Sequence, residues 1–114
     1  MSDCLFCKII AGEIPSKIVY QDDRILAFED INPQAPTHIL LIPRTHYASL
    51  NEVPEKESDL IGHLLLSARR IAAERGMGER GFRIVLNTGP DAGQDVFHIH
   101  FHLLGGRAMT WPPG

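Results

Sequence analysis

The segment between residues 98 and 104 constrains the fold more than any other, because histidine alternates with apolar residues through most of it. Its sequence is His-Ile-His-Phe-His-Leu-Leu. Side chains of a β-strand point alternately to opposite faces of the sheet. A strand over 98–104 would therefore place His98, His100 and His102 on one face, with neighbours about 6.5–7 Å apart. The apolar residues between them would pack on the other face, against a helix.

One long amphipathic helix is predicted over residues 54–75. Apolar residues recur there at intervals of three and four, which is the pattern of a helix with one buried face. These residues are Leu60, Ile61, Leu64, Leu65, Ala68, Ile71 and Ala72. Pro54 suits the first turn, and Gly76 suits the position where the helix stops.

Five strands are predicted around this helix, separated by short turns. They cover residues 17–20, 25–30, 38–43, 82–87 and 98–104, and a short helix precedes them at 6–11. No repeat or linker divides the chain, so a single domain over residues 1–114 is expected. This succession of elements predicts an α+β fold with an antiparallel sheet.

The composition limits the partners that we expect. The 114 residues carry a formal net charge of −3 without a basic block, which argues against nucleic acid because such binding depends on clustered Lys and Arg. No apolar run reaches the ~20 residues that span a bilayer, and residues 1–10 lack the pattern of a secretory signal. We therefore expect a cytoplasmic protein with no membrane partner. A small phosphorylated ligand remains compatible, because it needs only a few donors.

Three neighbouring imidazoles suggest two kinds of chemistry. One neutral imidazole can act as a nucleophile near pH 7 while another binds or protonates the reacting group. Alternatively, His-x-His on a strand can chelate zinc. A structural role for all three histidines is the remaining interpretation.

The preceding segment 87–94 is by itself an ordinary turn. Its glycines would nevertheless let backbone N–H groups approach a phosphate, and Gln94 adds a neutral donor.

The two cysteines, Cys4 and Cys7, are spaced Cys-x-x-Cys. This spacing is half of a zinc site, whose other ligands must come from elsewhere in the fold. A structural disulfide is not expected in a reducing compartment. Two alternatives stay open. The thiols can pack as small apolar side chains, or they can form a redox pair, although no thioredoxin-like βαβ pattern surrounds them.

The chain as a whole resembles the histidine triad family, specifically its Hint branch. The motif His-φ-His-φ-His-φ-φ is followed by Gly105-Gly106-Arg107 and by Trp-Pro-Pro-Gly at 111–114, with further matches at 27–31, 33–38 and 93–94. The resemblance implies a five-stranded sheet that pairs into a ten-stranded sheet in a homodimer. It also implies a purine nucleotide-binding phosphoramidase, which cleaves AMP or GMP from an amine through a nucleotidyl-histidine intermediate.

The resemblance implies roles for individual residues. His100 matches the nucleophile, His102 the histidine that contacts the phosphate, and Asp30 the carboxylate that holds the ribose hydroxyls. The phosphate-side loop corresponds to Asn87, Gly93 and Gln94, and the apolar base pocket to Phe6, Ile14, Phe28 and Ile31. Asp95 stands where animal members often have a serine near the leaving group. A carboxylate beside a phosphate is unfavourable unless it is protonated or turned away.

The resemblance also implies a structural zinc and a contact between subunits. Its zinc ligands would be Cys4, Cys7, His46 and His98. A closed Cys₂His₂ set is structural, so no catalytic metal is expected and His100 stays available for attack. The tail 108–114 is expected to reach the partner's active site and to place Trp111 near the leaving group, since no helix or strand signal holds it on its own subunit. The alternative is a frayed terminus.

Two other functions stay open at this point. One is a dinucleoside polyphosphate hydrolase of the same superfamily, although the sequence of the tail favours the Hint branch. The other is a nucleotide-binding interaction protein in which catalysis has been lost.

Overall fold

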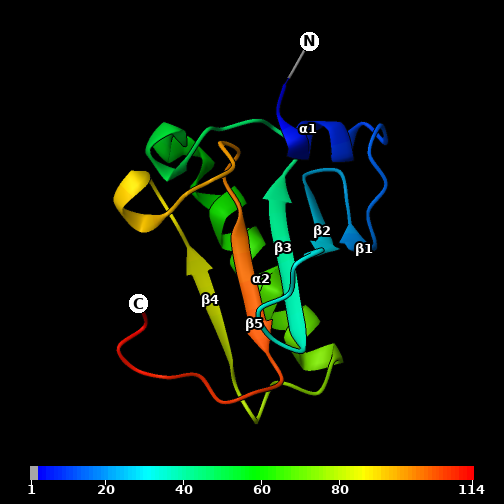
Figure 1. The fold of residues 1–114 in the computed structure, drawn as a ribbon. Helices are drawn as coiled ribbons and strands as arrows, with labels where there is room; N and C mark the ends of the chain where they lie inside the picture. Colours follow the sequence, from blue (N-terminus) through cyan, green and yellow to red (C-terminus); the bar gives the residue numbers. More distant parts are fainter. Residues whose placement is uncertain (1–2) are drawn as a thin grey trace.

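The computed structural model describes residues 3–114, which form a five-stranded antiparallel sheet with one long helix against it (Figure 1). The helices and strands are α1 (Leu5–Ile10), β1 (Ile18–Gln21), β2 (Ile25–Glu29), β3 (Thr37–Pro43), α2 (Ser58–Glu74), β4 (Phe82–Leu86) and β5 (Phe101–Gly105), with 3₁₀ turns η1 (Leu50–Glu52), η2 (Glu55–Glu57) and η3 (Pro90–Ala92). The strand order is β1-β2-β3-β5-β4. The predicted α+β fold is confirmed. No helix among the described residues is long and apolar enough to cross a membrane.

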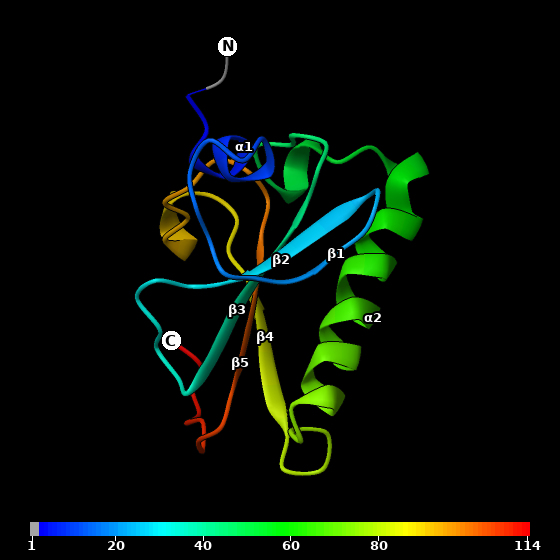
Figure 2. The ribbon, with the colours of Figure 1, turned by 90° about the vertical axis from the view of Figure 1, so that its right-hand side faces the viewer.

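The larger core lies between the sheet and α2, which covers one face (Figure 2). Apolar residues of α2 pack against the central strands β3 and β5, as the periodicity predicted. The helix begins at Ser58 rather than at residue 54, because Pro54 is extended and Glu55–Glu57 form the 3₁₀ turn η2 instead of α-helix. It ends before Gly76, whose φ of +76° is a conformation that glycine adopts without strain.

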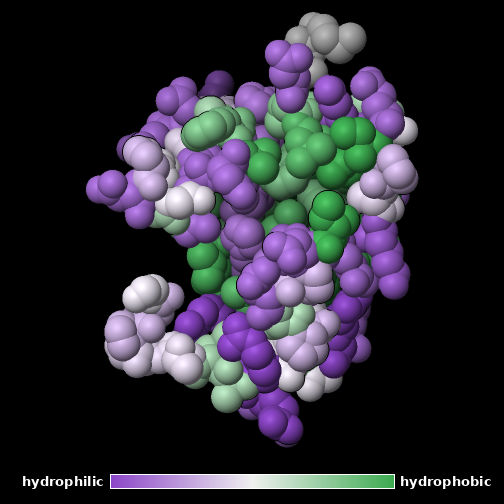
Figure 3. All heavy atoms as spheres, viewed as in Figure 1, coloured by the Kyte–Doolittle hydropathy of each residue, from purple (hydrophilic) through white to green (hydrophobic). Residues whose placement is uncertain are grey.

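A smaller core lies on the opposite face, beneath α1. Phe6 of α1 packs there against the β2 and β3 residues Leu26, Phe28, Leu40 and Ile42. Figure 3 shows hydrophobic residues gathered around α1 on this face, while polar residues dominate the lower half. The short helix is therefore held by burial of one aromatic ring rather than by its own length, which is too short for independent stability.

The predicted strand over 98–104 is wrong at its start, because β5 begins at Phe101. Residues 98–100 bond outside the sheet ladder: the Ile99 N–H donates to the Tyr47 carbonyl over 2.7 Å. The apolar residues of this segment nevertheless face α2 as predicted, since the side chains of Ile99, Phe101 and Leu103 are all buried in the core that contains α2. The ends of the other predicted strands and of the short helix differ from the observed ends by at most one residue.

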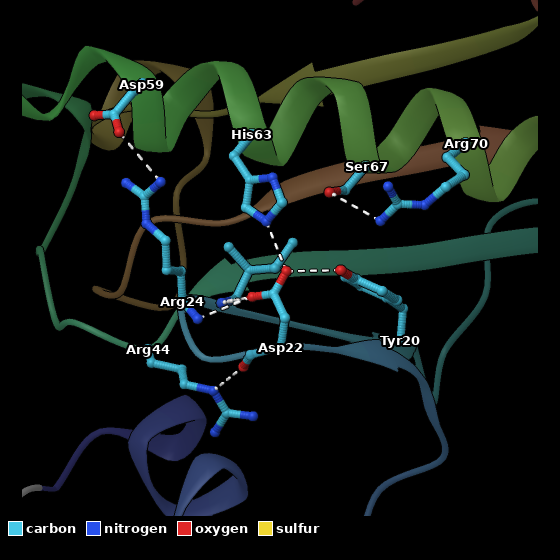
Figure 4. A network of polar contacts seen from close by, with 9 residues as sticks. Tyr20, Asp22, Arg24, Arg44, Asp59, His63, Ser67 and Arg70 are labelled. Carbon is cyan, nitrogen blue, oxygen red and sulfur yellow. Dashed lines mark hydrogen bonds and ion pairs between the residues drawn. The ribbon is translucent and has the colours of Figure 1, made fainter.

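Asp22 ties the β1–β2 turn to α2 (Figure 4). One carboxylate oxygen accepts the N–H groups of Arg24 and Ile25 at 2.9 Å, and the other lies 2.7 Å from both the Tyr20 hydroxyl and His63 Nε2 of α2. Burial opposes ionisation of Asp22, but the hydrogen bonds from Tyr20, the Arg24 backbone and His63 outweigh it and hold the pKa of Asp22 below its ordinary value.

Replacement of Asp22 by alanine should lower the free energy of unfolding at pH 7 by about 2–4 kcal/mol, because hydrogen bonds to a charged group contribute roughly 1.5–3 kcal/mol each and are not additive. The depressed carboxyl pKa stabilises the folded state above the unfolded pKa of about 3.9, and this stabilisation is lost as the pH falls below it. Urea unfolding at pH 7, 5 and 3 should therefore show a smaller loss on acidification for Asp22→Ala than for the wild type. Asp23→Ala, at an exposed neighbouring position, is the control. Equal losses for Asp22→Ala and the wild type would contradict the assignment.

Candidate active site and metal cluster

A cavity of about 240 Å³ opens beside α1 and the ends of β2 and β5. It brings together most of the residues predicted to bind a nucleotide: Phe6, Ile14, Phe28, Asp30, Ile31, Asp95, His100 and His102. Apolar side chains make up most of its lining, and carboxylates and imidazoles make up most of the rest. Ile31 is 97% exposed at the rim, so a flat ligand lying in the cavity would cover it. Asn87, Gly93, Gln94 and Trp111 do not line this cavity.

His100 is buried with its ring held on two sides. The ring of Phe6 meets it edge-on, with centroids 5.0 Å apart. Nδ1 of His100 lies 2.8 Å from the carbonyl oxygen of His98, so Nδ1 carries the proton and donates to it. A neutral imidazole protonated at Nδ1 has its lone pair on Nε2. The backbone therefore prepares Nε2 of His100 for nucleophilic attack.

His102 has the opposite tautomer, which is set by His38 of β3. The Gln34 N–H donates to Nδ1 of His38 over 3.0 Å, so the proton of His38 is on Nε2. That Nε2–H lies 2.9 Å from Nδ1 of His102, which therefore accepts. The proton of neutral His102 is then on Nε2, as a hydrogen-bond donor. Burial, followed by the charges of His100 and His38, lowers the pKa of His102 to about 4, so the ring is neutral near pH 7.

The two neighbouring imidazoles thus offer different groups, with their ring centroids 5.0 Å apart. His100 offers a lone pair and His102 an N–H. Sequence reasoning assigned no site role to His38, which decides this difference. The missing information is strand register: β3 pairs with β5 so that Leu40 lies opposite His102, and this places His38 diagonally next to it. Such a pairing is not visible in the sequence.

Asp30 follows β2 and lies beside His38 at the polar part of the cavity. One of its carboxylate oxygens accepts the Asn32 N–H at 2.8 Å, and the other lies 3.4 Å from His38 Nε2. A carboxylate has about four acceptor positions. Asp30 can therefore still accept hydrogen bonds from a ligand's hydroxyl groups.

Hydrogen bonds of the Gln94 side chain hold the loop before the histidines in place. The side-chain amide of Gln94 donates to the carbonyls of Ala48 at 2.7 Å and Val96 at 3.1 Å, and its oxygen accepts the Gly89 N–H at 3.0 Å. The backbone N–H groups of Gly93 and Gln94 also donate within the loop. In this conformation the side-chain amide of Gln94 and the backbone N–H groups of Gly93 and Gln94 make hydrogen bonds within the protein, which shape the loop.

Cys4, Cys7, His46 and His98 form a second cluster at the N-terminus of α1, and their candidate ligand atoms all lie within 4.8 Å of one another. Nδ1 of His98 is 3.4 Å from Cys4 Sγ and 3.2 Å from Nδ1 of His46. Tetrahedral zinc with two thiolate and two imidazole ligands requires distances of about 3.3–3.8 Å between ligand atoms. The set therefore fits zinc in both chemistry and spacing, and it joins three separate segments of the chain.

His98 connects this cluster to the active site. Its Nε2–H donates to the carbonyl of Pro43 over 2.8 Å, so its lone pair is on Nδ1 and faces the cysteines. Burial lowers the pKa of His98 to about 4, which keeps the ring neutral. Its backbone carbonyl meanwhile orients His100. Among the described residues, His98, His100 and His102 do not bring their ring nitrogens together as one candidate metal group, because Nδ1 of His98 faces the cysteines and Nδ1 of His100 faces a backbone carbonyl.

The tail does not reach the cavity of its own chain. Trp111 is 80% exposed, and the tail runs past the β4 edge of the sheet (Figure 1). No helix or strand follows β5 in the described part of the chain, as expected, but a side-chain contact holds part of the tail: the Thr110 carbonyl accepts a hydrogen bond from Arg83 of β4 at 3.0 Å. Arg107 also donates to the Gln34 carbonyl. Local side-chain contacts of this kind carry no periodic signal in the sequence.

The family model of the HIT domain matches residues 11–109, nearly the whole chain. The chain belongs to the HIT family. This HIT protein is 53% identical over 114 residues to the 14 kDa zinc-binding protein of Brassica juncea, covering 98% of this chain and 100% of that protein. It is 51% identical to the adenylylsulfatase HINT1 of Arabidopsis thaliana over 115 residues, covering 99% and 78%.

Solved structures agree with the assignment of this chain to the HIT family. The crystal structure of a HIT family hydrolase from Legionella pneumophila superposes with a TM-score of 0.96 at 54% identity, covering 98% of this chain and 100% of that one. The family, its hydrolase fold and a cluster suited to zinc are therefore established.

Proposed function

We propose that this protein binds a purine nucleoside monophosphate and hydrolyses the bond between its α-phosphate and an amine. The observation that carries the proposal is the pair of tautomers at His100 and His102. A nucleophilic nitrogen stands next to an N–H donor in a cavity that is lined largely by apolar side chains. The apolar lining suits a base, and the carboxylate of Asp30 suits ribose hydroxyls.

The reaction has two displacements. Nε2 of His100 attacks the α-phosphorus, the phosphorus–nitrogen bond breaks, and the amine leaves after taking a proton from water or a neighbouring group. The intermediate is a nucleotidyl-histidine. Water then attacks the same phosphorus, releases AMP or GMP and restores the imidazole. His102 donates its Nε2–H to a phosphate oxygen, which stabilises charge that develops during both steps.

The Cys₂His₂ cluster is proposed to hold a structural zinc. The B. juncea relative is named for zinc binding, and the four residues of this chain have matching ligand chemistry. When bound, zinc supplies a crosslink between α1, the loop after β3 and the segment before β5. No chemical step passes through the cluster. Its contribution to catalysis is to hold His98, whose carbonyl orients His100.

Homodimerisation remains part of the proposal. β4 is an edge strand whose residues are all partly exposed, and the exposed Trp111 lies beyond that edge. Edge strands and exposed aromatic residues are typical of subunit contacts. A partner's Trp111 near the leaving group would complete a site that one chain leaves open.

A substrate panel tests the function directly. Purified protein should hydrolyse adenosine 5′-phosphoramidate with a kcat/KM at least tenfold above that for the 2′,3′-dideoxy analogue, because Asp30 would lose its hydroxyl partners. The panel also includes guanosine 5′-phosphoramidate, a dinucleoside polyphosphate and adenylyl sulfate. Exclusive turnover of the dinucleotide would support the alternative hydrolase, and binding without any turnover would support an interaction protein.

A further inference from the structure

We infer that Asp95 determines the leaving-group specificity of this enzyme and selects conjugates whose leaving group carries a positive charge. The inference rests on the proposed function and deepens it. It starts from a second cavity, of about 470 Å³, that shares Leu5, Asp95 and Val96 with the nucleotide cavity. The two cavities are therefore adjacent, and Asp95 lies at their common boundary.

Asp95 is close to the reacting groups. Besides lining both cavities, its carboxylate acts on His102, where it partly opposes the larger effect of burial on that residue's pKa. The leaving group must depart from the α-phosphate, which is attacked by His100 and bound by His102. A leaving group larger than ammonia therefore extends past Asp95 into the second cavity.

The aspartate and lysine or arginine content of the second cavity's lining gives it a negative charge. Asp3 and Asp95 both line it, and no lysine or arginine does. The adjoining cluster adds no net charge when two thiolates and zinc are present, because their charges cancel. Phe97, 63% exposed on the wall, offers an aromatic face that also favours cations. A carboxylate here repels the substrate phosphate, and a cationic leaving group offsets that repulsion, whereas a neutral or anionic group does not.

Matched conjugates test the inference. AMP is joined to one amine of 1,5-diaminopentane, which leaves a terminal ammonium, and to pentylamine, which has the same length without the charge. The wild type should prefer the cationic conjugate by about fivefold in kcat/KM, and the preference should fall below about twofold in 0.5 M salt. Asp95→Asn should abolish the preference and raise the activity on adenylyl sulfate, whose leaving group is an anion.

These opposite effects separate a role in specificity from a structural one, because a damaged site would lose activity on every substrate. Asp91→Asn is the matched control, since Asp91 is exposed in the same loop and lines neither cavity. Equal activity of the wild type on both conjugates, or an unchanged preference in Asp95→Asn, would overturn the inference. If neither conjugate is hydrolysed, the proposed function fails, and the ratio of their dissociation constants then decides the inference. A fivefold ratio that Asp95→Asn removes supports it, and a ratio of one refutes it.

Discussion

Replacement of His100 by alanine should lower kcat/KM for adenosine 5′-phosphoramidate by about 10³-fold or more, because the attacking nitrogen is lost. Binding of AMP should change little, since the cavity keeps its apolar lining and Asp30. Steady-state kinetics and calorimetric titration with AMP separate the two effects. His63→Gln is the control, because His63 lies on α2, on the other side of the sheet.

The nucleophile is assigned wrongly if His100→Ala retains near-wild-type turnover while His98→Ala or His102→Ala abolishes it. The tautomers argue against this outcome. Nδ1 of His102 already accepts a hydrogen bond from His38, and Nδ1 of His98 faces the cysteines, so neither lone pair is available for attack. Only His100 has an Nε2 lone pair beside the cavity.

The combined change Cys4→Ser and Cys7→Ser should remove the metal and lower the melting temperature by about 10 °C or more. The crosslink joins segments that are otherwise held by a small core under α1, so its loss should loosen the N-terminal region first. The wild type as purified should carry about one zinc per chain, measured by atomic emission. Activity should fall less than in His100→Ala, because zinc acts through the position of His98.

Two results would contradict the zinc assignment. One is protein with reduced cysteines, purified without chelator, that contains no stoichiometric zinc. The other is a double variant with an unchanged melting temperature. Single Cys7→Ser protein supplied with excess zinc provides a graded comparison, since three ligands remain.

The sequence predicted the elements of the fold because their signals are local. The apolar periodicity of α2 and the Gly76 stop depend only on neighbouring residues, and both are present in the structure. The start of β5 was placed too early because alternation alone does not distinguish a strand from an extended segment. Residues 98–100 lie outside the strand, and their hydrogen-bond partners include Tyr47 and Pro43 rather than a neighbouring strand.

The candidate site was predicted in part, and the resemblance supplied most of its roles. What the sequence lacked was the hydrogen-bond partner of each ring. The Gln34–His38–His102 chain depends on strand register and on a backbone N–H. The hydrogen bonding of the Gln94 side chain depends on loop closure onto Ala48. Both decide which groups are donors or acceptors, and neither follows from residue type or spacing.

The stereochemical course at phosphorus tests the central claim most directly. The substrate is an adenosine 5′-phosphoramidate in which one phosphate oxygen is replaced by sulfur in a single configuration, and it is hydrolysed in ¹⁸O-labelled water. Two successive in-line displacements, first by His100 and then by water, predict overall retention of configuration. Inversion would show that water attacks directly, and it would contradict the nucleotidyl-histidine intermediate on which this account depends.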